Sequence, residues 1–370
     1  MHAGKQTELS PEPGDSGAGL RILIDALAAR FGGTAYAVIQ LARSLARRPE
    51  VSMVIVVTRS GSIVEAGVAQ EAAVRCVVLP AASRIELIRR TAWEAARLPA
   101  LVAREECDVV ISMSGMLPRS PDYRLMCLLF NPVMYENRTA ANLLRRWAVR
   151  RTAREAEYLV APSRSMADLA SASIGRECSM VPLGVDHGIF SPSADAGEEI
   201  LCVADFYAHK RHDLLFDAWL RLPSPRPRLR LVGNPSVDPQ AYARLSARIE
   251  LLPEPDSITL DHGIPLERLV AAYHRARVFV MPSERESFCM PLVESMACGV
   301  PVVARGLLSL RETGGEGARY VDGDDPGQWA AILRQLIEDD VEHQLMRQAA
   351  IASAARFSWE SFVADLAARF

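Results

Sequence analysis

Short apolar runs rich in β-branched residues alternate with longer helical stretches along almost all of this 370-residue chain. Such alternation is typical of parallel sheets whose strands are joined by crossover helices. It predicts an α/β fold, with helical patterns such as Ala35–Arg47 and Ile85–Ala103 between the strands. The expected strands are Leu20–Asp25, Val51–Val57, Val74–Leu79, Asp108–Met113, Leu125–Phe130, Tyr158–Ala161, Ile200–Ala204, Leu229–Val232, Ser257–Leu260, Val278–Met281, Pro301–Ala304 and Ala318–Val321.

The chain is too long for one ordinary domain and has the right length for two. Residues 1–190 carry 23 basic and 19 acidic side chains, whereas residues 191–370 carry 19 and 26. This change of sign falls in the turn-rich stretch Gly184–Gly197. We therefore expect two doubly wound Rossmann-like domains facing a cleft, residues 20–190 and 191–356, after a disordered tail at 1–19.

Three helical patterns follow the last expected strand, at Pro326–Asp339, Val341–Arg356 and Ser358–Phe370. One sheet has no obvious place for all three. We therefore expect the final helix, residues 357–370, to cross back onto the first domain and tie the two sides of the cleft together.

The composition excludes several classes of protein. With 49% hydrophobic and 24% charged residues and a net charge of -3, the chain is neither disordered nor a nucleic-acid-binding polycation. No apolar run approaches the ~20 residues of a membrane span, and the first residues contain no apolar signal core. The seven cysteines form no CxxC pair, which favours the reducing cytoplasm.

The segment at 283–304, SERESFCMPLVESMACGVPVVA, has the densest functional signal. A strand is expected to end before it, and a helix to begin at Pro291. This order places Glu286 and the amides of Phe288, Cys289 and Met290 at the carboxyl edge of the sheet, where open α/β sheets bind ligands. Glu294, expected on the first turn of an apolar helix, suits a ribose diol. An ordinary helix with an acidic first turn is an equally weighted alternative.

Lys210 follows the expected strand Ile200–Ala204 and begins an amphipathic helical pattern. A cation at this position suits a pyrophosphate, and lysine is otherwise present only at Lys5. A solvated helix start is the alternative. His209 and His212 could form a metal pair, but the spacing supplies no third ligand, so no metal site is predicted.

Gly32 and Gly33 lie between the first expected strand and a long helix. Adjacent glycines allow a backbone to approach a ligand closely, although they are most often a simple turn. The sequence there is not GxGxxG, so a nicotinamide dehydrogenase is not expected.

The segment Arg138–Arg154, RTAANLLRRWAVRRTAR, contains six arginines and no acidic residue. It suits peripheral contact with anionic lipid or steering of an anionic acceptor. A solvated face in an arginine-rich chain is the favoured alternative.

Together these segments resemble the GT-B retaining glycosyltransferases of family four, from Leu20 to the C-terminus. The most specific match is the E-x7-E element, Glu286 and Glu294 within PSERESFCMPLVESMACGVPVV. Supporting matches are the glycine turn, Lys210 after a strand, the PLGVD stretch Pro182–Asp186, and the terminal FSWE, Phe357–Glu360.

The resemblance implies transfer of a sugar from a nucleoside diphosphate sugar to an acceptor hydroxyl, with retained configuration and without metal or other cofactor. It places Glu294 on the ribose, Lys210 on the diphosphate, and Glu286 with the amides of 288–290 on the transferred sugar. Gly33 would approach the diphosphate from the opposite domain. Frequency among relatives favours UDP over GDP.

The sequence departs from the family pattern in three places. Asp205 occupies the place of an arginine five residues before the lysine. Phe130 and Asn131, on the acceptor side, stand where a histidine is common, and Cys289 replaces a glycine. These departures leave two alternatives open: a non-catalytic partner that keeps the scaffold, and a sugar-nucleotide epimerase or hydrolase. Peripheral membrane contact of a cytoplasmic enzyme would use Arg138–Arg154.

Overall fold

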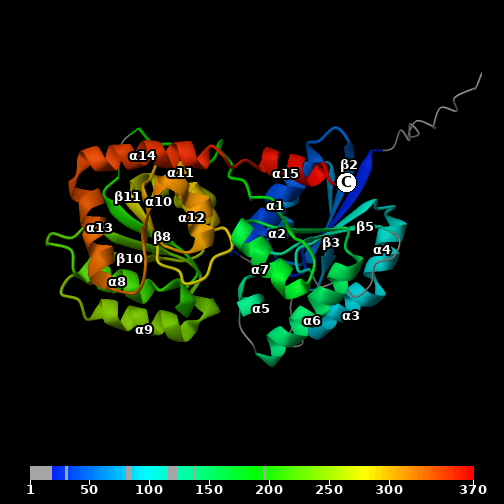
Figure 1. The fold of residues 1–370 in the computed structure, drawn as a ribbon, viewed down its shortest axis with the longest axis horizontal. Helices are drawn as coiled ribbons and strands as arrows, with labels where there is room; N and C mark the ends of the chain where they lie inside the picture. Colours follow the sequence, from blue (N-terminus) through cyan, green and yellow to red (C-terminus); the bar gives the residue numbers. More distant parts are fainter. Residues whose placement is uncertain (1–18, 30–31, 81–85, 116–122, 137–138, 195–196) are drawn as a thin grey trace, which may run out of the picture.

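The computed structural model describes residues 19–29, 32–80, 86–115, 123–136, 139–194 and 197–370. These residues form two lobes lying side by side, each built around a parallel sheet with helices on both faces (Figure 1). The α/β architecture expected from the alternating pattern is therefore confirmed. Residues 1–18 of the expected tail lie outside the described residues.

The first sheet has seven parallel strands in the order β3-β2-β1-β4-β5-β6-β7. Its strands are β1 (Leu20–Asp25), β2 (Val51–Arg59), β3 (Val74–Leu79), β4 (Val109–Ser112), β5 (Arg124–Leu128), β6 (Tyr158–Ala161) and β7 (Ser179–Met180). The edge strand β7 is two residues long and was not predicted. In the register, Leu23 of β1 lies opposite Ile55 and Val110 on its two neighbours.

The second sheet has six strands in the order β10-β9-β8-β11-β12-β13. They are β8 (Glu199–Val203), β9 (Leu229–Val232), β10 (Ile258–Asp261), β11 (Ala276–Met281), β12 (Val302–Arg305) and β13 (Ala318–Val321). In both sheets the second and third strands along the chain lie on one side of the first strand, and the later strands lie on its other side. The strand order therefore reverses between β1 and β4, and between β8 and β11, which is where such folds bind ligands.

The helices cover both sheets. The first lobe contains α1 (Gly32–Ala46), α2 (Ile63–Val68), α3 (Glu86–Ala96), α4 (Leu98–Arg104), α5 (Val133–Glu136), α6 (Ala140–Glu155) and α7 (Arg164–Ile174). The remaining helices are α8 (His212–Leu220), α9 (Pro239–Glu250), α10 (Leu266–Arg275), α11 (Met290–Ala297), α12 (Leu308–Gly314), α13 (Pro326–Glu338), α14 (Asp340–Ala354) and α15 (Trp359–Ala367). The single helix predicted at Ile85–Ala103 is wrong. It is two helices, because Pro99 suits only the first turn of a helix and α4 restarts there.

Alternate residues of each strand enter opposite halves of the core. In β1, Ile22 and Ile24 face one cluster, whereas Leu23 faces another together with Ile55 and Val110. All of these side chains are fully buried. Strands buried on both faces read as continuous apolar runs, which is why the sequence located them well.

The final helix, α15, crosses from the second lobe and packs on the first (Figure 1). It contacts α1, and the rings of Trp359 and Tyr36 meet edge to face with centroids 6.5 Å apart. Ser358 also forms a parallel bridge with Val185. A Cβ on Gly184 would lie 2.2 Å from the Trp359 nitrogen, so only glycine fits this crossing. The predicted crossing helix is confirmed.

A second contact between the lobes caps a helix. Glu312, on α12 of the second lobe, accepts hydrogen bonds from the backbone amides of Arg164 (2.6 Å) and Ser165 (2.9 Å). These amides are in the first turn of α7 in the first lobe, where a carboxylate also complements the helix dipole.

Candidate functional site

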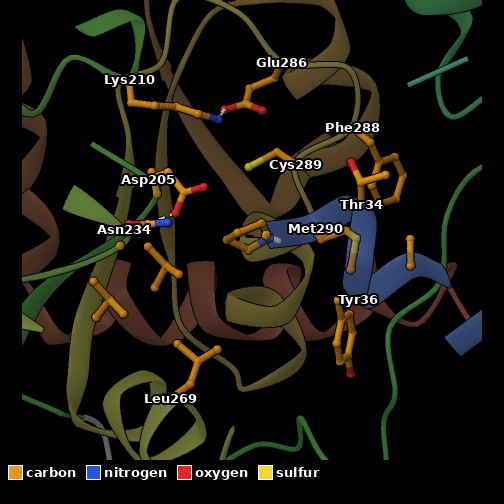
Figure 2. A pocket seen from close by; sticks show the side chains of 18 of the residues that line it. Thr34, Tyr36, Asp205, Lys210, Asn234, Leu269, Glu286, Phe288, Cys289 and Met290 are labelled. Carbon is orange, nitrogen blue, oxygen red and sulfur yellow. Dashed lines mark hydrogen bonds and ion pairs between the residues drawn. The ribbon is translucent and has the colours of Figure 1, made fainter. Parts of the chain in front are cut away.

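A cleft of about 1170 Å³ lies between the two lobes. Figure 2 shows α1 on one side of it and the strand ends of the second lobe on the other. The first lobe contributes Gly32, Gly33, Thr34, Tyr36, Phe130 and Pro132, among others. The second lobe contributes most of the charged and polar residues, including Asp205, His209, Lys210, Asn234, Arg285, Glu286 and Ser287.

Lys210 and Glu286 form an ion pair in the cleft, with Nζ 2.6 Å from Oε1 (Figure 2). They follow β8 and β11, the two neighbouring strands at which the order of the second sheet reverses. The Lys210 side chain is 18% exposed and that of Glu286 10%. Burial lowers the pKa of Lys210, but the adjacent Glu286 carboxylate raises it further, and the net pKa is above the ordinary value. The site therefore holds a fixed cation.

Lys210 itself closes a short 3-10 turn, Ala208–Lys210, and does not begin α8 as the sequence predicted. Arg211 then adopts a left-handed conformation (φ 54°) before the helix starts. Its guanidinium contacts the carboxylates of Glu284 and Asp324, each at 2.8 Å. This network, which no sequence spacing revealed, fastens the lysine turn to the loop that carries Glu286.

The loop between β11 and α11 is held in place from both ends. The Glu284 amide donates to the His209 carbonyl at 2.8 Å. The Ser309 hydroxyl of α12 donates to the Glu286 carbonyl, also at 2.8 Å. Because backbone contacts fix this loop, the Glu286 side chain is positioned before any ligand arrives.

Helix α11 begins at Met290, one residue earlier than predicted, after Cys289 in a left-handed conformation (φ 73°). Only three non-glycine residues have positive φ in the described part of the chain, and two of them, Arg211 and Cys289, flank this site. The amide of Met290, the first residue of the helix, has no acceptor within the helix, and Met290 lines the cleft. The partial positive charge of a helix N-terminus therefore lies at the cleft. The Phe288 ring packs edge-on against Phe357, with centroids 5.4 Å apart.

Glu294 lies on the second turn of α11, not on the first as expected, and is 8% exposed. It is not among the residues that line the cleft. Its Oε2 accepts a 2.8 Å hydrogen bond from the Tyr273 hydroxyl, and burial raises its pKa to about 7. The partner expected for this carboxylate was a ribose diol; in the structure the hydrogen bond comes from a tyrosine of α10.

Asp205 lines the cleft just beyond the end of β8 (Figure 2). Its Oδ1 accepts a 3.0 Å hydrogen bond from the Asn234 amide, after β9. Its Oδ2 faces the first lobe, because a Cβ on Gly32 would lie 3.4 Å from it. Burial raises the pKa of this carboxyl. Asp205 therefore points into the cleft.

Several cleft residues were missed by the sequence reasoning. They follow the next strands of the second sheet: Gly233 and Asn234 after β9, and His262 after β10, with Leu269 nearby on α10. Their position immediately after predicted strands was a usable signal. The wall that Leu269 forms with Ile264 and Leu266 is apolar and suits a planar base.

The two histidines near Lys210 do not act together. His209 lines the cleft, whereas His212 is buried and stacks on Phe206 with centroids 4.6 Å apart. Burial lowers the pKa of His212 to about 4. The residues that the structure describes contain no cluster of three or more metal-ligating side chains.

On the first lobe, Gly32 has φ 67° and Gly33 lies opposite Met290, whose sulfur would be 3.8 Å from a Cβ at Gly33. The glycine turn therefore faces α11 directly across the cleft. Phe130 and Pro132 line the cleft, but Asn131 between them is exposed and is not among the lining residues.

Residues 190–354 match the family described as "Glycosyl transferases group 1", and residues 31–188 match "Glycosyltransferase Family 4". The two matches account for both lobes and for the cleft. The chain belongs to the family-four glycosyltransferases.

The family-four chain is also similar to curated D-inositol 3-phosphate glycosyltransferases. It is 32% identical over 224 residues to the protein from Acidothermus cellulolyticus, which covers 54% of this chain and 49% of that one. The relative from Corynebacterium urealyticum is 42% identical over 104 residues, 28% of this chain and 24% of that one. The chain thus matches about half the length, or less, of these relatives.

Solved structures share the GT-B fold of this family-four chain. Sucrose-phosphate synthase from Thermosynechococcus elongatus superimposes with a TM-score of 0.80 at 19% identity, covering 94% of this chain and 98% of that one. Anabaena HepE in complex with UDP-glucose has a TM-score of 0.79 at 17% identity, with the same coverage. WaaG, a glycosyltransferase involved in lipopolysaccharide biosynthesis, has a TM-score of 0.70 at 14% identity, covering 94% and 98%.

Proposed function

We propose that this chain is a retaining, metal-independent glycosyltransferase that moves a sugar from a nucleoside diphosphate sugar, UDP before GDP, to an acceptor hydroxyl. The observation that carries the proposal is the Lys210–Glu286 pair, 2.6 Å apart at the reversal point of the second sheet and open to the cleft. The pair puts a cation for the diphosphate next to a carboxylate that can accept hydrogen bonds from sugar hydroxyls.

The second lobe offers matching surfaces for the rest of a nucleotide donor. The apolar wall at Ile264, Leu266 and Leu269 lines the cleft and suits the base. Glu294 is buried and does not line the cleft, and we assign it to the ribose. For the ribose to reach Glu294, the carboxylate must share or exchange its Tyr273 hydrogen bond. The start of α11 lies beside the cationic end of Lys210 and adds the partial positive charge of a helix N-terminus.

The reaction we propose needs no nucleophile from the protein. The acceptor oxygen would attack the anomeric carbon on the face from which the diphosphate leaves, as the bond from that carbon to the phosphate oxygen breaks. The departing phosphate oxygen would take the acceptor's proton. Lys210 and the amide of Met290 would stabilise the negative charge that develops on the diphosphate, which is a large contribution in a water-poor site.

Similarity supports UDP as the nucleotide, since one relative of the same fold is described in complex with UDP-glucose. The first test is thermal unfolding with UDP, GDP, ADP or dTDP, on wild type and on Lys210→Ala. A ligand at about 100 times its dissociation constant adds about 2.7 kcal/mol to the free energy of unfolding. We expect a clear rise in Tm with UDP that is absent in the variant.

The rival functions give different results in this test. No shift with any nucleotide would favour a non-catalytic scaffold, with Asp205 as the first residue to examine. A shift together with donor consumption that no hydroxyl compound accelerates would favour a hydrolase or epimerase. Once an acceptor is found, the anomeric configuration of the product decides between retention and inversion.

A further inference from the structure

Helix α6 places three large apolar side chains in solvent. Leu143 is 54% exposed, Leu144 63% and Trp147 60%. Most other exposed apolar side chains of the described residues are scattered over both lobes, such as Leu251 and Leu308. A tryptophan exposed beside two leucines, by contrast, forms a compact apolar patch.

The same face of α6 continues as a row of arginines. At 100° per residue, Leu143 and Trp147 align with Arg150 and Arg154, and Leu144 aligns with Arg151. All three of these arginines are exposed, whereas the opposite face, at Asn142, Val149, Thr152 and Ala153, is buried on the first lobe. The outward face thus has an apolar first half and a cationic second half.

Two of these arginines present their guanidinium groups to solvent. Arg151 and Arg154 are exposed, and Glu155 is the one carboxylate that α6 contains. Arg150 donates to the Ser173 carbonyl at 2.5 Å, which fixes the side chain but leaves the guanidinium charged. An aromatic and aliphatic patch bordered by arginines is the chemistry that enters the interface of an anionic bilayer.

We propose that this face of α6 is a docking surface for anionic lipid, with Leu143, Leu144 and Trp147 inserted among the headgroups and the arginines paired with lipid phosphates. No helix in the described part of the chain is long and apolar enough to cross a membrane. The docking that we propose is peripheral. Arg138, at the start of the segment expected to contact lipid, lies outside the described residues.

The position of α6 connects this surface with the cleft. The helix lies beside α5 at the lower edge of the first lobe (Figure 1), and Arg146 donates to the Tyr135 carbonyl of α5 at 3.2 Å. Phe130 and Pro132, which line the cleft, immediately precede α5. A membrane bound at α6 would thus lie against the lobe proposed to receive the acceptor, although docking itself does not depend on transferase activity.

Co-sedimentation with vesicles tests the proposal without any enzyme assay. We expect the full chain to bind phosphatidylglycerol vesicles at low salt and to bind phosphatidylcholine vesicles at least about tenfold more weakly. Arg151→Gln with Arg154→Gln should weaken binding about thirtyfold, and Leu144→Ser with Trp147→Ser at least about tenfold. Binding should also fall as salt is added.

The second lobe supplies matched controls. Val341 and Leu345 are 72% and 58% exposed one turn apart on α14, but acidic residues flank them. Changing both to serine should leave binding within about twofold, as should Arg244→Gln with Arg268→Gln, two exposed arginines of that lobe.

Tryptophan emission gives a site-specific readout. Trp219, Trp329 and Trp359 are fully buried and Trp93 is half-buried, so a blue shift on vesicle binding would come chiefly from the exposed Trp147. Trp147→Phe should abolish the shift while the protein still sediments. Equal binding to both lipids, or no binding at low salt, would overturn the proposal. So would a concentration-dependent dimer that Trp147→Ser disrupts, because the face would then belong to a second copy.

Discussion

The first lobe places Gly32 and Gly33 after β1, whereas the second lobe places Asp205 and Lys210 after β8, the strand at the equivalent central position. Both segments reach the same cleft from sheets of the same strand order. The first-lobe segment presents backbone without side chains, and the second-lobe segment presents charged side chains. The same topology can therefore supply either close approach or electrostatic binding, depending on which side chains follow a strand.

The comparison indicates that the two lobes contribute different kinds of group to the cleft. Charges that would hold a diphosphate lie on the second lobe, fixed by the Arg211 network, before the lobes meet a ligand. The first lobe completes the cleft with glycine and apolar residues and faces α11 at Met290. Under the proposed function, such an arrangement would let the donor bind to one lobe while the other excludes water.

The largest effect on sugar transfer should come from substitutions in the second lobe. Lys210→Ala and Glu286→Gln should each reduce sugar transfer by at least about a hundredfold, because each removes a contact worth ~3–4 kcal/mol in the transition state. The rate of donor consumption with acceptor, or of slow donor hydrolysis before an acceptor is known, provides the measurement.

A control is needed because removing one member of a buried ion pair leaves the other unpaired. The double variant Lys210→Met with Glu286→Gln removes both charges and should unfold near the wild-type temperature while remaining inactive. Full activity in a folded single variant would contradict the role assigned to the second lobe.

Glu294 should make stability depend on pH. Its pKa is about 7 in the folded chain, against an ordinary value of 4.5 for a glutamate. A raised folded pKa adds stability below the unfolded pKa, and this contribution is lost as the pH rises through the folded pKa. Glu294→Gln, which cannot ionise, should therefore gain about 2–3 kcal/mol over wild type between pH 4.5 and pH 8.

Urea unfolding at pH 5, 6, 7 and 8 measures this difference. The gain of Glu294→Gln should increase with pH, and UDP binding by the variant should be weaker because a carboxylate on the ribose is lost. A gain that stays constant with pH would show that Glu294 does not titrate in this range.

Most of the fold could be predicted from the sequence. Short runs rich in apolar and β-branched residues mark the strands in the sequence, so β1, β3, β6, β9 and β13 coincide with their predicted bounds. The two-residue strand β7 was missed because Ser179 and Met180 have no such run. The crossing of α15 was predicted from an excess of helices over strands.

The site was only partly predictable. Residues that follow a strand, such as Lys210 and Glu286, could be placed at the sheet edge by topology alone. The hydrogen bond from Tyr273 to Glu294 could not, because 21 residues and a strand separate the partners. Nor could the left-handed conformation of Arg211, which depends on carboxylates from distant loops.

Substitution of Asp205 tests whether the second lobe binds an anion as tightly as its other residues allow. Asp205→Asn keeps an oxygen for the Asn234 amide but removes a negative charge from the cleft, so UDP should bind about tenfold more tightly at pH 8. Asp205→Ala loses the hydrogen bond as well and separates the two effects. Isothermal calorimetry gives the affinities. Weaker binding by Asp205→Asn would instead show that the carboxylate accepts a hydrogen bond from the ligand.

The smallest effects on stability and donor binding should come from substitutions in the glycine turn. Comparing Gly32→Ala with Gly33→Ala distinguishes backbone strain from contact with the ligand. Gly32→Ala must adopt φ 67°, which costs about 1 kcal/mol of stability. Gly33→Ala has room, since Met290 would be 3.8 Å from the new methyl group, so its Tm should equal that of wild type. If the diphosphate passes next to this turn, the same methyl group will raise the donor KM severalfold. An unchanged KM in Gly33→Ala would mean that the donor is held by the second lobe alone.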